Sequence, residues 1–216
     1  MIDLHTHSLF SDGVLLPAEL IQRAQQAGYE AIALTDHVDL STFDFVIPRI
    51  IKACDAACRT MSIRAIPGVE ITHVQPGAIA GIVRECRALG ARLIVVHGET
   101  VVEPVPEGTN LSAVQAGIDI LAHPGLISPD VVRLAADNGV CLEITARKGH
   151  CLSNGHVARM AMQYGARLVL NTDTHTPDNL ITAAHAQQIA IGSGLTENDF
   201  STMLINSREL VAKARH

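Results

Sequence analysis

The amino-acid sequence predicts an α/β protein whose strands form a mostly parallel β-sheet. Short apolar runs alternate with longer helical patterns throughout the 216 residues. The apolar runs are nearly uninterrupted, which is typical of strands buried on both faces of a sheet. A helix after each strand produces parallel pairing with right-handed crossovers. Periodicity alone leaves two arrangements open, an open doubly wound sheet and a closed barrel.

The expected strands are short apolar segments that end in polar residues. "MIDLHTH" opens the chain, and "YEAIALTDH" and "ARLVLNTDTH" have the same form. The seven expected strands span residues 1–7, 29–37, 63–72, 91–99, 118–125, 140–146 and 166–175.

The segments between the strands have helical periodicity and residues that start or stop a helix. In "PAELIQRAQQAG", Pro17 suits the first turn and Gly28 ends the helix. Pro48 lies near the first turn of the second helix, and Ser128 and Pro129 mark an N-cap and a first helical position. The expected helices span residues 17–28, 44–61, 76–90, 110–117, 128–139, 153–165, 177–190 and 196–214.

The composition fits a single globular domain over residues 1–216. Hydrophobic residues make up 48% and charged residues 18%, and no linker or low-complexity segment divides the chain. Aromatic residues are only 3%, so Leu, Ile, Val and Ala must form the core. The net charge of -6 argues against nonspecific binding to nucleic acid or to an anionic membrane, whereas a small phosphorylated ligand stays compatible with it.

The sequence also predicts the compartment. Its first residues lack the basic and apolar regions of a secretion signal, and no apolar run reaches the roughly 18 residues of a membrane span. The five cysteines are an odd number without zinc-finger spacing, which is typical of reduced thiols. We therefore expect a soluble, cytoplasmic protein with no membrane partner. The sequence does not indicate an oligomeric state.

Histidine and carboxylate residues stand where six of the expected strands end. The carboxyl ends of parallel strands share one rim, where active sites form. Side chains two residues apart on a strand point the same way, so the pair His5 and His7 can hold one ion together, and so can Asp173 and His175. A single histidine at a strand end is more often structural, but six such strand ends together predict a metal site. The candidate ligands are His5, His7, Asp12, His37, Glu70, His97, His123, Asp173 and His175.

Neutral imidazole and carboxylate suit zinc, manganese or iron. Nine candidate ligands are too many for one tetrahedral ion, and with Glu70 as a bridge they suffice for two or three divalent ions. The cofactor prediction is therefore two or three ions of zinc, manganese or iron.

These residues carry a resemblance to a known family. The segments "DLHTHSLFSDG", "LTDH", "PGVEIT", "VVHGE", "LAHPG" and "NTDTH" resemble the motifs of the PHP (polymerase and histidinol phosphatase) family, in that family's order, from residue 3 to residue 175. The resemblance implies a distorted (βα)7 TIM-like barrel with a trinuclear metal site at the carboxyl ends of the strands. It also implies that catalysis depends on Glu70, Asp173 and His175 through the metal cluster.

The resemblance further implies which residues hold each ion. Asp12 stands where many family members have a histidine. The first ion would be held by His5, His7, Glu70 and Asp173, the second by Glu70, His97 and His123, and the third by Asp12, His37 and His175.

The chemistry expected of such a site is phosphate-ester hydrolysis. Divalent ions lower the pKa of bound water to near neutrality and neutralise charge on a phosphoryl group. We expect a phosphomonoesterase that acts on a small phosphorylated metabolite, with histidinol phosphate as one candidate. The alternatives are an exonuclease or nucleotide phosphodiesterase of the same family, a metallohydrolase of C–N bonds, and a non-enzymatic metal-binding module.

Substrate-binding residues are expected in the loop after residues 140–146. Arg147 could bind phosphate oxygens bidentately and Lys148 could add a point charge. His150 and His156 could support the ligands or protonate a leaving group. A solvated loop is the alternative for Arg147 and Lys148. Asp36 and His73 are expected to orient ligands, and a solvated loop is favoured over substrate contact for Glu99, Glu103 and Glu107.

Overall fold

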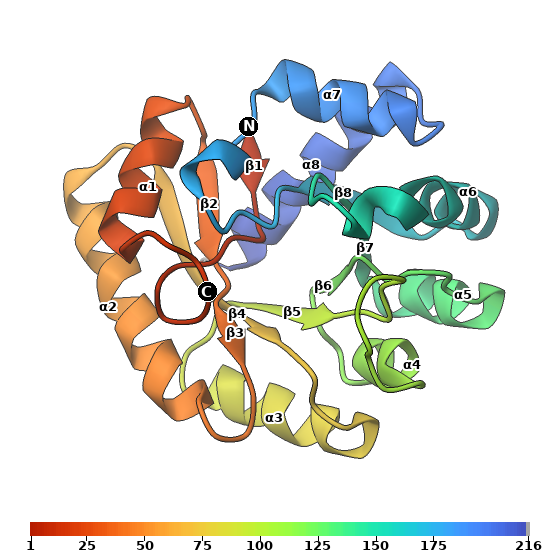
Figure 1. Ribbon diagram of the computed structural model, residues 1–216, viewed down its shortest axis with the longest axis horizontal. Helices are drawn as coiled ribbons and strands as arrows, with labels where there is room; N and C mark the ends of the chain where they lie inside the picture. Colours follow the sequence, from red (N-terminus) through yellow and green to blue (C-terminus); the bar gives the residue numbers. More distant parts are fainter. Residues whose placement is uncertain (215–216) are drawn as a thin grey trace.

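Parallel strands form one sheet that curves into a nearly closed barrel in the computed structural model, which describes residues 1–214 (Figure 1). Neighbouring strands pair in the order β1-β2-β4-β5-β6-β7-β8, and β3 pairs with β4 in line with β2. The expectation of a distorted (βα)7 barrel is confirmed, and the open sheet is excluded. The strands are β1 (Ile2–Asp3), β2 (Ala31–Leu34), β3 (His37–Val38), β4 (Arg64–Ile71), β5 (Leu93–His97), β6 (Ile120–Ala122), β7 (Cys141–Thr145) and β8 (Arg167–Asn171).

The gap between β8 and β1 is closed mainly by side chains. The Leu4 amide donates to Asn171 Oδ1 over 2.9 Å, and the buried Asp3 carboxylate accepts from the Thr172 amide at 3.1 Å. Beyond the strand ends, the His7 amide donates to the Thr174 carbonyl at 2.8 Å. These bonds bring the first and last motifs of the sequence side by side.

The helices surround the sheet on its outer face (Figure 1). None of the helices within residues 1–214 is both long and apolar enough to cross a membrane. The helices are α1 (Pro17–Gln26), α2 (Phe43–Thr60), α3 (Pro76–Ala88), α4 (Thr109–Gln115), α5 (Pro129–Asn138), α6 (Asn154–Tyr164), α7 (Ala183–Gly192) and α8 (Glu197–Lys213), with 3-10 turns η1 (His150–Ser153) and η2 (Pro177–Asn179).

Some boundaries differ from expectation for local reasons. The expected helix 177–190 is divided: Pro177 opens a 3-10 turn closed by a capping box, and α7 begins only after Thr182, whose hydroxyl accepts from the His185 amide. Pro48 lies in the second turn of α2 rather than the first. Ser128 takes the N-cap position of α5, but its hydroxyl makes no capping hydrogen bond.

Helix α8 covers the amino-terminal end of the barrel and leaves the opposite end open for a site. Its Leu210 and Val211 belong to the apolar cluster that fills the barrel interior. Lys213 of the same helix binds Asp119, directly before β6, at 2.9 Å. Figure 1 shows α8 crossing behind the strands.

Candidate metal centre

The nine predicted ligands gather at the carboxyl ends of the strands. Six of them, all but His5, His7 and Glu70, line a cavity of about 610 Å³. His5, His7 and Glu70 lie beneath it and are fully buried or nearly so. The groups whose ligand atoms lie close enough to share an ion are His5–His7–Glu70, His5–His123–Asp173, His7–Asp12–His37–His175 and His97–His123–His150.

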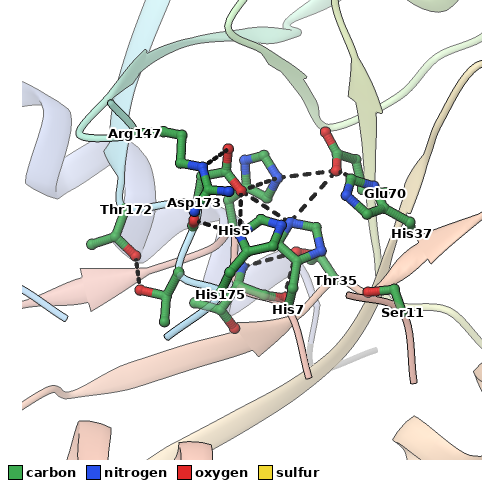
Figure 2. Close-up of polar contacts among 12 residues, drawn as sticks. His5, His7, Ser11, Thr35, His37, Glu70, Arg147, Thr172, Asp173 and His175 are labelled. Atoms are coloured by element: carbon green, nitrogen blue, oxygen red, sulfur yellow. Dashed lines mark hydrogen bonds and ion pairs between the residues drawn. The ribbon is translucent and has the colours of Figure 1, made fainter. Parts of the chain in front are cut away.

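The four residues predicted to hold the first ion, His5, His7, Glu70 and Asp173, form the buried centre of the site (Figure 2). His7 Nε2 lies 3.1 Å from Asp173 Oδ1, and His5 Nε2 lies 3.3 Å from Glu70 Oε2. His7 Nε2 is 3.6 Å from the same Glu70 oxygen. The imidazole nitrogens and carboxylate oxygens of these four residues thus lie 3.1–3.8 Å apart in their pairs.

Several of these atoms are buried with no hydrogen-bond partner, which is the test of whether the residues fit a metal. A buried polar atom without a partner costs about 1–3 kcal/mol, so such atoms are rare in folded proteins. Within residues 1–214, every side-chain atom of this kind belongs to a predicted metal ligand. Divalent cations would satisfy those of the atoms that face the centre, and the imidazole and carboxylate donors fit such ions. The atoms are His5 Nε2, His7 Nδ1 and Nε2, both oxygens of Glu70, His123 Nδ1 and Asp173 Oδ1. His7 Nε2 and Asp173 Oδ1 lie 3.1 Å apart, and Glu70 Oε2 lies 2.8 Å from His37 Nδ1, but neither contact has the geometry of a hydrogen bond.

The electrostatics favour the metal-binding protonation states of His7, His123, Glu70 and Asp173. Burial lowers the pKa of His37, but Glu70 and Asp12 raise it to about 9. Burial lowers the pKa of His7 to about 4 and holds the pKa of His123 well below its ordinary value. Burial alone would raise the pKa values of Glu70 and Asp173, but nearby histidines, His5 first, hold both well below their usual range. Neutral imidazole and ionised carboxylate are the metal-binding forms of these side chains.

His5 is oriented by Glu143, a buried residue of β7 for which no role is predicted from the sequence. Glu143 Oε1 accepts from His5 Nδ1 at 2.9 Å, so His5 Nε2 faces the centre. Burial lowers the pKa of His5, but the carboxylates of Glu143, Glu70 and Asp173 raise it well above its ordinary value. A cation would take the place of that proton. The only sequence signal for Glu143 is a carboxylate inside an apolar strand.

Asp12, one of the three residues predicted to hold the third ion, lies on the loop after β1. Asp12 Oδ2 lies 3.1 Å from His175 Nε2, and Oδ1 lies 3.5 Å from His37 Nε2. Burial raises the pKa of Asp12, but His175 and His37 lower it to about 2, so the carboxylate is ionised. The structure therefore brings this aspartate to the other ligands.

Asp36 holds the loop that carries Asp12. Its Oδ1 accepts from the amides of Ser8 and Ser11 at 2.9 and 3.0 Å. Both serine hydroxyls also donate to the carboxylate. The turn is tight at Gly13, where a Cβ would lie 2.2 Å from the His7 carbonyl oxygen. These contacts set the position of the Asp12 backbone.

Two predicted ligands have a strained backbone. His123 and Asp173 have positive φ angles of 27° and 53°, in a region that residues other than glycine rarely adopt. Such strain gathers at functional sites, where the surrounding structure enforces it. His123 Nε2 lies 3.6 Å from Glu70 Oε1. This contact links the predicted ligands of the second ion to those of the first.

The residues predicted to bind substrate divide into two pairs. Arg147 lines the cavity and directs its guanidinium toward Asp173, 4.0 Å from Oδ2 (Figure 2). His150 also lines the cavity and lies against His97 and His123. Lys148 is exposed and does not line the cavity.

His156 is the second residue that the structure does not bring to the cavity. It lies in the first turn of α6, and its Nε2 donates to the Ile127 carbonyl at 2.9 Å. Among the three glutamates after β5, only Glu103 lines the cavity of the candidate centre, where its Oε2 lies 3.1 Å from His97 Nε2. Glu99 and Glu107 line a separate hollow.

Comparisons with known proteins agree with this geometry. The chain is 42% identical over 214 residues to an uncharacterized protein of Methanocaldococcus jannaschii, covering 98% of each. It is 30% identical over 220 residues to a probable phosphatase of Shewanella pealeana, covering 88% of this chain and 83% of that protein. The second match supports the expectation of a phosphatase-type hydrolase.

Two solved structures share the fold at low sequence identity. One is a chain of an archaeal ribonuclease P bound to mature tRNA, with a TM-score of 0.76, 15% identity and coverage of 99% of this chain and 91% of that one. Another is histidinol phosphate phosphatase of Lactococcus lactis with zinc, L-histidinol and phosphate, with a TM-score of 0.59, 16% identity and coverage of 99% and 93%. The PHP domain model matches residues 3–214, and the chain belongs to the PHP family.

Proposed function

We propose that this protein is a metal-dependent phosphoesterase that hydrolyses a small phosphorylated metabolite in the cytoplasm, with two or three ions of zinc, manganese or iron as cofactor. The observation that carries the proposal is the set of buried, partnerless ligand atoms directed at one cavity beside Arg147. The first ion is assigned to His5, His7, Glu70 and Asp173, the second to Glu70, His97 and His123, and the third to Asp12, His37 and His175.

Divalent ions in such a site supply Lewis-acid chemistry, because they make water nucleophilic near neutral pH and neutralise charge on a phosphoryl group. The protein chain supplies the orientation. Glu143 fixes the His5 ring, and Asp36 fixes the loop of Asp12. Glu70, Asp173 and His175 act through the ions that they hold.

Arg147 is the cation available to a phosphate in this cavity. Its distance of 4.0 Å from Asp173 is long for an ion pair, and its side chain is 30% exposed. A guanidinium in this position can bind two phosphoryl oxygens. The opposite side of the cavity offers Phe10, Val38 and Thr42 to the rest of the substrate. A volume of about 610 Å³ suits a small molecule.

A small substrate is favoured over nucleic acid by the net charge of -6 and by the closed cavity floor. Histidinol phosphate is one candidate, through the family resemblance alone. The remaining alternatives are a hydrolase of C–N bonds and a non-enzymatic metal-binding module. The test below includes a result that would favour each of them over the proposal.

The test is a screen of phosphate esters, nucleotides and amides with added Mn²⁺ or Zn²⁺. We expect turnover of a phosphomonoester that Asp173→Ala and His123→Ala abolish, whereas His185→Ala, exposed on α7, leaves it unchanged. Elemental analysis should find more than one ion per chain. Turnover of amides without phosphate esters would contradict the proposal, and so would a protein that binds metal and hydrolyses none of the panel.

A further inference from the structure

Glu103 and His150 lie beside His97 at one edge of the candidate centre. Glu103 belongs to the loop after β5, and His150 opens the turn η1 after β7. Glu103 Oε2 is 3.1 Å from His97 Nε2, and Oε1 is 3.3 Å from His150 Nε2. One carboxylate therefore joins two imidazoles from different loops.

The other ring nitrogens of both histidines already have partners. His97 Nδ1 donates to the Gly98 carbonyl at 3.1 Å. His150 Nδ1 is bonded to Thr100 Oγ1 at 2.8 Å. Neutral His150 can accept from the Thr100 hydroxyl at Nδ1 and donate from Nε2 to Glu103 Oε1. In neutral His97, by contrast, the lone pair is left on Nε2, where it faces Glu103 Oε2. Two lone pairs repel unless a cation lies between them.

The distances match ligands that share an ion. Metal–ligand distances of about 2.0–2.2 Å place neighbouring ligand atoms about 3.0–3.5 Å apart. The distances of 3.1 and 3.3 Å from Glu103 to His97 and His150 fall in this range. Charge-assisted hydrogen bonds between ionised side chains are shorter, at about 2.7–2.9 Å.

His123 completes the group. Its ligand atom lies within 4.8 Å of those of His97 and His150. The ring centroids of His97 and His123 lie 4.5 Å apart, and those of His123 and His150 lie 4.2 Å apart. Three imidazoles in contact with one another are therefore better explained as metal ligands than as three protonated rings.

We propose that Glu103 and His150 coordinate the second ion, together with the three ligands that the family motifs predict for it, Glu70, His97 and His123. The second ion is then held from the ends of four strands. Glu103 is its most exposed ligand, with 39% of its side chain accessible. This inference rests on the metal centre of the proposed function.

The experiment follows zinc release from the loaded protein as a competing chelator is added, with the ions counted by elemental analysis. In Glu103→Gln and in His150→Gln, we expect one ion to leave at a chelator concentration about tenfold lower or more. The remaining ions should leave as in the wild type. The double variant should weaken that same ion alone, with non-additive effect.

Matched controls are Glu107→Gln, on the same loop but outside the cavity, and His185→Gln, exposed on α7. Glu103→Gln is isosteric at a partly exposed position, so the fold should tolerate it. A release profile of either test variant that coincides with its control would overturn the proposal, as would equal weakening of every ion. Metal release does not depend on turnover, so an inactive protein that shows this pattern would refute the proposed function and leave this inference intact.

Discussion

His5 of the first motif and Glu143 of β7 are joined by a hydrogen bond of 2.9 Å across 138 residues of sequence. The same carboxylate accepts from the His123 amide at 3.1 Å and from Asn171 Nδ2 at 2.9 Å. Glu143 thus orients two predicted ligands and one strand end without facing the centre itself.

The first prediction concerns this carboxylate. Glu143→Gln removes the charge that holds the proton on His5 Nδ1, so His5 Nε2 is no longer fixed as the free nitrogen. Loss of such a partner lowers metal affinity about 10–100-fold. Chelator titration of the loaded protein measures it, with Glu85→Gln on the exposed side of α3 as control. Unchanged affinity would show that Glu143 serves the barrel rather than the metal.

The second prediction separates a ligand from the residue that positions it. Asp36→Ala leaves the buried donors of Ser8 and Ser11 without an acceptor and should lower the free energy of unfolding by about 3 kcal/mol. Asp12→Ala removes a half-exposed side chain and should change it by less than about 1 kcal/mol.

Both variants should lose one ion, because Asp36 sets the loop from which Asp12 reaches His37 and His175. Urea unfolding in excess chelator measures the stability, and elemental analysis counts the ions. Asp44→Asn, exposed at the start of α2, is the control. Full stability of Asp36→Ala would contradict the role of Asp36 in holding the loop. Retention of every ion by Asp12→Ala would contradict the role of Asp12 as a ligand.

Much of this arrangement was predictable because parallel strands bring their carboxyl ends to one rim. The residues that end the apolar runs, such as His97 and His123, needed no knowledge of loops to be placed together. The barrel itself followed only from the family motifs, since periodicity does not decide whether β8 meets β1. That closure depends on Asp3 and Asn171, polar residues whose contacts lie more than 160 positions away.

The rest could not be predicted because it depends on loop conformation. Arg147 and Lys148 are neighbours with the same charge, yet only Arg147 points into the cavity. Glu103 looked like one of three equivalent loop glutamates, and the path of residues 98–105 alone distinguishes it. The positive φ angles of His123 and Asp173 have no sequence signal, because residues other than glycine adopt them in only a few per cent of cases.

The third prediction uses Arg147 and Lys148 as a matched pair. Arg147→Gln removes the proposed bidentate phosphate contact and should lower kcat/KM for a phosphate ester about 10–100-fold. Arg147→Lys should recover only part of this, because an ammonium lacks the planar fork. Lys148→Gln should change kcat/KM less than about twofold, since Lys148 is exposed outside the cavity. Equal losses in Arg147→Gln and Lys148→Gln would point to general charge steering instead.

The fourth prediction is a pH dependence that arises at the barrel closure. Burial raises the pKa of Asp3 to about 6, although the Thr172 hydroxyl and amide and the His5 amide all donate to its carboxylate. Its unfolded value is near 3.9. Between these values the folded state binds more protons than the unfolded state, so the free energy of unfolding falls as pH rises from about 4 to 6.

Above pH 6 the buried carboxylate costs up to about 3 kcal/mol, which corresponds to the raised pKa of Asp3. Asp3→Asn removes the charge and keeps one acceptor for the Thr172 donors. We therefore expect this variant to be more stable than the wild type by about 1–3 kcal/mol at pH 8 and equal to it near pH 4. Urea unfolding of the metal-free proteins at the two pH values measures the difference. A variant that is less stable at both would mean that both carboxylate oxygens are needed to close the gap between β1 and β8, and that their hydrogen bonds outweigh the cost of the buried charge.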